Sequence, residues 1–303
     1  MRGKFILYLV AANLLWAGNY LAGRILRLSM GPFTLNGIRW IISAAILWVI
    51  VRKRGEVVPL LREWKELALL GFIGMFLFSS LTYWGLSIVP AGEAGLLSGF
   101  TPLAVLIAGF IIAKDAVRLW QWLMVVLSIG GEILLLGGGA TVHADSLFGA
   151  LILILAALSW GVYTALGRRY RHRFSPLVLT TGAAIWGAIP SALLGIWNLT
   201  THPVTLTVSS TMALLYISTM ASVVAFMMWS AGVNRLGSGT AAPYLNLLPV
   251  FTAILAVILL HESLTVAQLE GGLIVVAGAV GAGFSRNAAS ALKDSQTSTS
   301  MLE

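Results

Sequence analysis

Two groups of aromatic and polar residues lie deep inside long apolar stretches of this chain. Asn13, Trp16 and Tyr20 follow an i, i+3, i+7 pattern and therefore share one face of a helix. Trp16 lies about 16 Å into that helix at ~1.5 Å per residue, too deep for an interfacial tryptophan belt. Such a face favours the wall of a cavity whose ligand stacks on rings, with packing between helices as the alternative. A similar group recurs later in the chain: Trp160, Tyr163 and Thr164.

Other apolar stretches contribute further candidates for the wall of the cavity and for hinges that would let the helices move. Pro102 and Pro249 are expected to kink their helices and to act as hinges, or else to hold a fixed bend. For each of the additional wall candidates packing is an equally good interpretation; they are Tyr83, Trp84, Phe100, Trp229 and Tyr244.

Three charged residues fall within apolar stretches: Arg39, Glu132 and Glu270. A charge at the bilayer centre costs roughly 2.5–3.5 kcal/mol on insertion scales, so each is a functional candidate. Arg39 and Glu270 lie near one end of their stretches, where Arg39 suits packing or gating at the mouth of a pathway. Glu132 lies deeper, and it either pairs with Arg39 or carries a proton. We therefore consider Glu132 for proton coupling.

Composition indicates which elements position these residues. Apolar residues make up 58% of the 303, charged residues 10%, and the mean hydropathy is +0.92. A chain of this kind is typical of an all-α membrane protein. Ten apolar stretches have about the length that crosses a bilayer, the first being a retained helix and not a cleaved signal peptide. They span residues 5–26, 32–51, 67–88, 94–113, 119–137, 147–167, 176–197, 210–233, 240–260 and 266–284.

The chain repeats itself, and five spans separate the copies. Trp16, Gly23, Arg24 and Pro32 recur 144 positions later as Trp160, Gly167, Arg168 and Pro176. Pro102 and other residues recur 147 positions later. An odd number of spans turns the second copy over, which predicts two inverted five-helix repeats, residues 1–138 and 146–285. Residues 286–303 are expected to be a disordered cytoplasmic tail.

The positive charges predict the orientation. Of the 19 lysines and arginines, 16 fall in the loops on the side of the N-terminus. Arg24 and Arg27 fall on the other side, and Arg39 lies within a span. This asymmetry predicts both termini in the cytoplasm. It also explains the net charge of +8 without nucleic acid as a partner.

The repeated residues resemble one family. Ala156–Arg169 (AALSWGVYTALGRR) and Leu260–Gly278 (LHESLTVAQLEGGLIVVAG) are similar to the sixth and ninth helices of the EamA family in the drug/metabolite transporter superfamily. Leu14–Tyr20 and Gly31–Arg39 resemble its first two helices. The resemblance implies a ten-helix exporter of small metabolites or amino acids in the bacterial inner membrane. It also implies a central cavity bounded chiefly by helices 1, 3, 4, 6, 8 and 9.

The residue types narrow the substrate. The second half has no Lys or Arg inside a span, which disfavours phosphorylated substrates. A neutral or zwitterionic molecule fits best, and an aromatic amino acid is one candidate. A multidrug exporter, an intramembrane enzyme and a scaffold are the alternatives. No catalytic set or metal-ligand spacing is found, and there is no cysteine, so we expect no enzyme, metal or cofactor. The lipid bilayer is the expected surrounding and a monomer the expected state.

Asp115 and its repeat partner Glu262 occupy equivalent loop positions. Each is expected to cap a helix or to lie at the interface as a charge, with a gate contact as the alternative.

Overall fold

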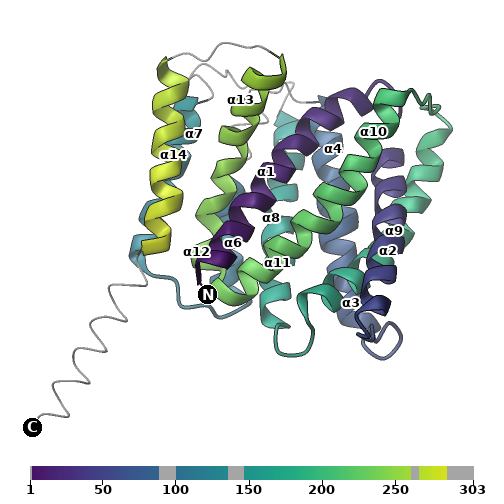
Figure 1. Ribbon diagram of the computed structural model, residues 1–303, viewed down its shortest axis with the longest axis horizontal. Helices are drawn as coiled ribbons and strands as arrows, with labels where there is room; N and C mark the ends of the chain where they lie inside the picture. The colour runs from purple at the N-terminus through teal and green to yellow at the C-terminus, as the bar shows by residue number, and fades with distance from the viewer. Residues whose placement is uncertain (1, 89–99, 136–146, 261–265, 285–303) are drawn as a thin grey trace, which may run out of the picture.

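The structure is a computed structural model that describes residues 2–88, 100–135, 147–260 and 266–284, and every element in these ranges is a helix (Figure 1). The all-helical prediction is therefore confirmed for the described residues. Glu262 and the predicted tail lie outside them. The first half contains α1 (Arg2–Leu26), α2 (Pro32–Lys53), α3 (Trp64–Leu70), η1 (Gly71–Leu77), α4 (Phe78–Ile88), α6 (Phe100–Ile111) and α7 (Leu119–Leu135). The second half contains α8 (Leu147–Arg169), α9 (Pro176–Leu199), α10 (Val208–Tyr216), η3 (Ile217–Val224), α11 (Ala225–Leu236), α12 (Ser238–Ala241), η4 (Ala242–Asn246), α13 (Leu247–Leu260) and α14 (Val266–Phe284).

Among the residues that the structure describes, six helical stretches are long and apolar enough to cross a membrane. They are Arg2–Gly23, Pro32–Lys53, Trp64–Ile88, Leu147–Arg169, Pro176–Leu199 and Val208–Leu236. The shorter apolar helices are Phe100–Ile111, Leu119–Leu134 and Leu269–Gly281.

Proline sets the start of two long helices. α2 begins at Pro32 after Gly31 in an extended conformation, and α9 begins at Pro176 after an extended Ser175. Proline suits the first helical position because its fixed φ matches the helix and its missing N–H would have no partner there. The Ser175 hydroxyl accepts a hydrogen bond from the Val178 N–H at 3.2 Å, which completes the cap of α9.

Two of the long helices are interrupted by π-helical segments, which the sequence analysis did not predict. η1 joins α3 to α4, and η3 joins α10 to α11. π-Helical turns displace carbonyls from the regular i→i−4 ladder and are frequent at functional sites. Side chains of other helices donate to carbonyls of both segments. The bonds are Ser159 Oγ to Ile73 O (2.9 Å), Asn36 Nδ2 to Met75 O (3.3 Å), Ser43 Oγ to Ser218 O (2.8 Å) and Trp16 Nε1 to Ala221 O (3.0 Å).

A third interruption lies between the start of α12 and the start of α13. The 3₁₀ segment η4 separates these two helices, with Pro243 near its start. Pro249 lies in the first turn of α13, directly after this segment. Proline lacks the N–H that a continuous α-helix needs, so the change of helix type at this place has a local cause.

The helices pack side by side, with small residues at the close contacts. α2 lies along α9, and α7 lies along α14 at the left edge of Figure 1. α1 packs against α11 and α13, while α8 packs against α4 and α6. A Cβ on Gly37 of α2 would lie 2.8 Å from the Ser191 carbonyl oxygen of α9. Glycine therefore permits the approach of α2 to α9, as in other membrane helix pairs.

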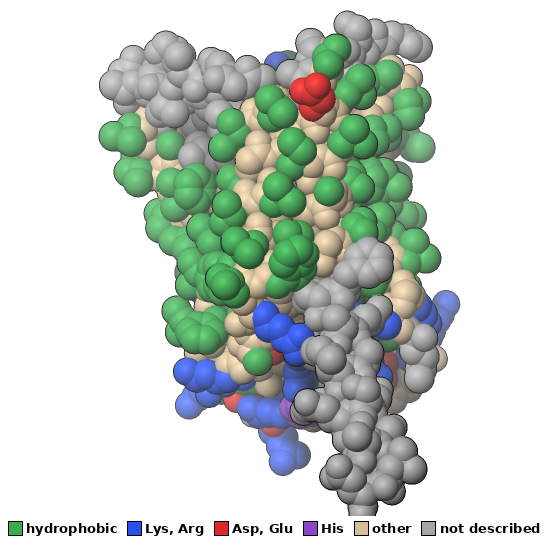
Figure 2. All heavy atoms as spheres, turned by 90° about the vertical axis from the view of Figure 1, so that its left-hand side faces the viewer, with side chains coloured by type: hydrophobic (Ala, Val, Ile, Leu, Met, Phe, Trp, Pro, Cys, Tyr) green, Lys and Arg blue, Asp and Glu red, His purple; other side chains and the backbone are tan. Residues whose placement is uncertain are grey.

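The outer surface is divided into an apolar belt and a positively charged end. Figure 2 shows hydrophobic side chains covering the face of α7 and α14, with Lys and Arg gathered at the lower end. Leu123, Val126, Leu269 and Leu273 are each at least half exposed on this face. The start of α1 and the end of α14 lie at the same lower end (Figure 1).

Candidate functional site

An aromatic cluster connects the first helix of the chain with the second half. Trp16 of α1 meets Trp160 of α8 edge-to-face, with ring centroids 5.2 Å apart. Phe226 and Trp229 of α11 each lie 5.7 Å from Trp16. Tyr163 lies 5.4 Å from Trp160 on the same helix. These geometries are the ones that aromatic pairs prefer. The structure thus brings together four of the predicted wall residues, Trp16, Trp160, Tyr163 and Trp229.

Three rings that the sequence analysis did not select complete the cluster. Phe226 takes part in it directly, Phe78 of α4 lies 4.7 Å from Trp160, and Trp40 of α2 lies 5.1 Å from Phe226. Phe78 and Phe226 have no sequence signal that separates them from lipid-facing phenylalanines. Trp40 does have one, because it follows Arg39 directly and lies within a predicted span.

Two indole donors of the cluster are satisfied by described residues, and two, those of Trp160 and Trp40, are not. Trp16 Nε1 donates to the Ala221 carbonyl of η3 at 3.0 Å, and Trp229 Nε1 donates to the Thr164 hydroxyl at 3.3 Å. Trp160 Nε1 is buried and has no hydrogen-bond partner among the described residues. Burying a polar group without a partner costs free energy. A ligand with an acceptor oxygen would supply the missing bond.

Tyr163 presents a second donor beside Trp160. Its side chain is 2% exposed, and its ring packs on Gly74 of η1, where a Cβ would lie only 2.3 Å away. The hydroxyl, near those of Thr180 and Ser230, forms no hydrogen bond of normal geometry with a described residue. Thr164, also a predicted wall residue, is buried next to Tyr163 and accepts the Trp229 bond.

Asn13 and Tyr20 lie on α1 on either side of Trp16. Asn13 is fully buried, and its Nδ2 donates to the Leu9 carbonyl of the same helix at 2.8 Å. Its Oδ1 has no partner among the described residues. Tyr20 is half-buried. The predicted face therefore points into the protein, with Trp16 as its contact to the ring cluster.

Arg39 is buried, although it lies near the end of its span. Only 5% of it is exposed, and its guanidinium donates to the hydroxyl of Tyr83. The Tyr83 hydroxyl in turn donates to Asn19 Oδ1 at 3.3 Å. The guanidinium also lies 4.9 Å from the Trp40 ring, a cation–π contact that adjoins the aromatic cluster. The pairing of Arg39 with Glu132, considered from sequence, is not formed.

The other predicted residues lie outside the ring cluster. Glu132 is 2% exposed on α7, and Tyr244 is 3% exposed on η4. Phe100, the first residue of α6, is 48% exposed and makes no ring contact with the cluster within the described residues. Pro102 is buried in the first described turn of α6.

A small void lies between the ring cluster and the positively charged end of the bundle. It measures about 10 Å³, and Tyr163, Thr164 and Trp229 line one side of it. Val233, Asn234 and Arg168 line the other. A void of this size holds at most about one water molecule. In this conformation the void is therefore too small to hold a substrate.

Comparison with known proteins agrees with this picture of a multi-pass membrane protein. Residues 3–137 and 147–284 match the EamA-like transporter family. An uncharacterised transporter of Archaeoglobus fulgidus is 30% identical over 282 residues, which cover 92% of this chain and 96% of that protein. The chain belongs to the EamA-like transporter family, and we conclude that it is a membrane transporter.

More distant relatives carry more specific names. A probable amino-acid metabolite efflux pump of Salmonella typhimurium is 24% identical, over 87% of this chain and 89% of its own. A probable terminal-alkyne amino-acid exporter of Streptantibioticus cattleyicolor is 26% identical, over 91% and 92%. One solved crystal structure shares the fold with a TM-score of 0.79 at 24% identity, covering 93% of this chain and 97% of the other.

Proposed function

We propose that this transporter exports neutral or zwitterionic small metabolites, most of all amino acids, through a pathway centred on the aromatic cluster. The observation that carries the proposal is the pair of buried donors, Trp160 Nε1 and Tyr163 OH, among stacked rings. Rings stack on an apolar or aromatic side chain, while the two donors suit a carboxylate. The names of the two amino-acid exporters among the relatives agree with this substrate class.

We further propose that the chain crosses a bacterial inner membrane ten times as two inverted halves. The packing supports this, because α2 packs against its repeat partner α9, and α7 against its repeat partner α14. The two π-helical segments also occupy equivalent positions, since η1 shifted by 147 residues overlaps η3. The start of α1 and the end of α14 lie at the positively charged end, as expected for two cytoplasmic termini (Figures 1 and 2).

Alternating access around the cluster requires the rings to separate. Each half contributes rings, Trp16, Trp40 and Phe78 from the first and Trp160 and Phe226 from the second. The proposed hinges are the interrupted helices next to the cluster and two prolines. The prolines are Pro249, after η4, and Pro102, in α6. Arg39, held by Tyr83, is the proposed gating residue on the side away from the termini.

A transport assay in liposomes tests the substrate class. Purified protein is expected to move labelled tryptophan, phenylalanine or threonine down an imposed concentration gradient, and to move sugar phosphates no faster than empty liposomes do. The reason is that the ring cluster supplies stacking surfaces and two donors, while Arg39, the arginine that adjoins it, already donates to the Tyr83 hydroxyl. Folded protein that moves no member of a full amino-acid panel would contradict the amino-acid proposal. Transport of aromatic cations by such protein would favour a multidrug exporter.

Proton coupling, if the protein uses it, is assigned to Glu132. Glu132→Gln is expected to abolish flux driven by a pH jump while leaving flux down a substrate gradient, because glutamine keeps the shape but releases no proton. Glu270→Gln is the matched control, since Glu270 is exposed on α14. Wild-type pH-driven flux in Glu132→Gln would remove this residue from the coupling mechanism.

A further inference from the structure

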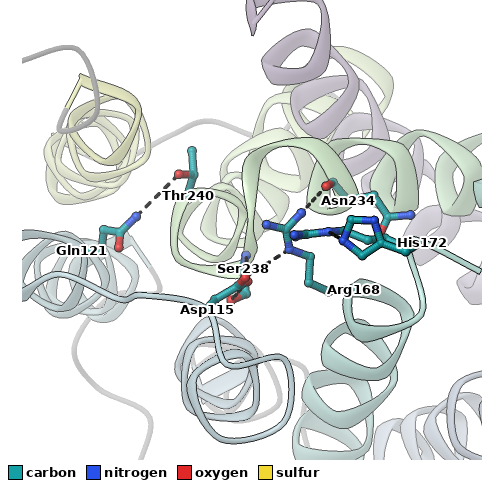
Figure 3. A network of polar contacts seen from close by, with 8 residues as sticks. Asp115, Gln121, Arg168, His172, Asn234, Ser238 and Thr240 are labelled. Atoms are coloured by element: carbon teal, nitrogen blue, oxygen red, sulfur yellow. Dashed lines mark hydrogen bonds and ion pairs between the residues drawn. The ribbon is translucent and has the colours of Figure 1, made fainter. Parts of the chain in front are cut away.

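A polar network ties the two halves together at the charged end of the bundle (Figure 3). Asp115, in the loop between α6 and α7, forms an ion pair with Arg168 at the end of α8, with Oδ1 and Nε 3.1 Å apart. The other carboxylate oxygen, Oδ2, accepts hydrogen bonds from the N–H and hydroxyl of Ser238 at 2.9 and 2.8 Å. Arg168 also donates to the carbonyl of Asn234 near the end of α11. Asp115 of the first half therefore contacts α8 and α12 of the second half directly, and α11 through Arg168.

Asp115 caps a helix, as expected, but one in the opposite half. Ser238 is the first residue of α12, and the preceding Gly237 has a φ of +85°, which lets the chain turn sharply between α11 and α12. A carboxylate at a helix N-terminus accepts free N–H groups and is favoured by the helix dipole. The side chains of Arg168 and Asp115 are only 10% and 13% exposed, so water screens this ion pair less than a surface pair.

The network also adjoins the ring cluster, because both line the same small void. The void above it is lined by Arg168 and Asn234 on one side and by Tyr163 and Trp229 of the ring cluster on the other. Beside the network, Gln121 of α7 is within 3.5 Å of the Thr240 hydroxyl of α12, a second contact between the halves. These contacts join the two halves at this end of the bundle.

We infer that Asp115 and Arg168 form a latch that keeps the terminus-bearing end of the pathway closed and must break before this end opens. The inference rests on the proposed transport function. Its structural basis is one carboxylate of the first half that binds α8 and α12 of the second, together with the bond from Arg168 to α11.

Thiol labelling tests the latch without any substrate. The chain has no cysteine, so Val233→Cys introduces the only thiol, at a position that is 2% exposed and lines the void. A membrane-impermeant maleimide is added to the face that bears the termini. Asp115→Ala or Arg168→Gln in this background is expected to raise the labelling rate by about tenfold or more, since a hydrogen bond to a charged group changes populations by that order. Asp115→Glu, which keeps the carboxylate, is expected to restore slow labelling.

The controls separate the latch from general loosening and from transport. Arg169→Gln removes an exposed charge from the neighbouring position and is expected to leave labelling unchanged. Should Asp115→Ala not fold, as judged by gel filtration and melting, Asp115→Asn replaces it, because asparagine keeps an acceptor for Ser238 and loses only the ion pair. Unchanged labelling in folded Asp115 and Arg168 variants would overturn the latch even if amino acids are transported. Faster labelling upholds it even if the amino-acid panel fails.

Discussion

Replacing Gly187 by alanine is expected to lower the melting temperature of the protein markedly and to reduce flux as well. A Cβ at this position would lie 2.5 Å from the Gly71 carbonyl oxygen and 2.6 Å from the Met75 Cβ, both in η1. The first of these is a backbone atom that no rotamer change can move. Overpacking costs about 1–3 kcal/mol where side chains can adjust, and the clash with backbone places this substitution at the upper end.

The loss of flux follows from what η1 holds. Its Ile73 carbonyl accepts from Ser159, and its Met75 carbonyl accepts from Asn36. Gly74 of the same segment packs directly under the Tyr163 ring. A shift of η1 away from α9 would therefore loosen the contact between these two helices. It would also move Gly74, on which the Tyr163 ring of the aromatic cluster packs.

Thermal melting followed by tryptophan fluorescence measures the effect on stability. Gly130→Ala is the control, because a Cβ at Gly130 of α7 meets nothing within 4 Å. Alanine exceeds glycine in helix propensity by about 1 kcal/mol, so this variant is expected to melt at the wild-type temperature or above it. Equal melting of Gly187→Ala and wild type would mean that η1 and α9 are less closely packed than the structure shows.

The fold was predictable in outline because apolar length and composition are properties of the sequence. The stretch at 176–197 corresponds to α9, and that at 147–167 to α8, since a helix must satisfy its backbone within itself in a bilayer. The interruptions were not predictable in the same way. η1 and η3 contain no proline, and their displaced carbonyls are satisfied by Asn36, Ser43 and Trp16 from distant parts of the chain. Tertiary partners, not local propensity, explain these segments.

The site was predictable where a residue type is unusual for its depth. Trp16 and Trp160 were identified because tryptophan is expected at the membrane surface and not in the middle of a span. Phe226 was not, because phenylalanine is common on lipid-facing surfaces. Asn36 had a usable signal, as the only amide in its apolar stretch, and the structure places it between Ser80 and Ser191.

Replacing Trp160 by phenylalanine is expected to weaken transport without lowering the stability of the protein. The same replacement at Trp16 is expected to lower the stability. Trp160→Phe keeps a ring in the cluster and removes the Nε1 donor that has no partner among the described residues. The protein then loses a buried unsatisfied group, so its melting temperature is expected to stay or rise. Trp16→Phe instead leaves the Ala221 carbonyl of η3 without its donor, at a cost of about 1–3 kcal/mol.

The KM and the maximal rate of transport show whether Trp160 Nε1 binds the substrate. If Trp160 Nε1 binds an acceptor oxygen of the substrate, Trp160→Phe raises KM by about tenfold, since a hydrogen bond to a charged group is worth about 1.5–3 kcal/mol. The maximal rate should change less, because the ring that the helices pack around is still present. Trp160→Ala removes that ring from contact with Trp16, Phe78 and Phe226, and both KM and stability are expected to suffer. Wild-type flux and KM in Trp160→Phe, together with wild-type flux in Trp16→Ala and Trp160→Ala, would place the substrate pathway elsewhere in the bundle. A KM that rises in Trp160→Phe while the melting temperature holds is the result expected if Trp160 Nε1 binds the substrate, because the ring remains and only the donor is lost.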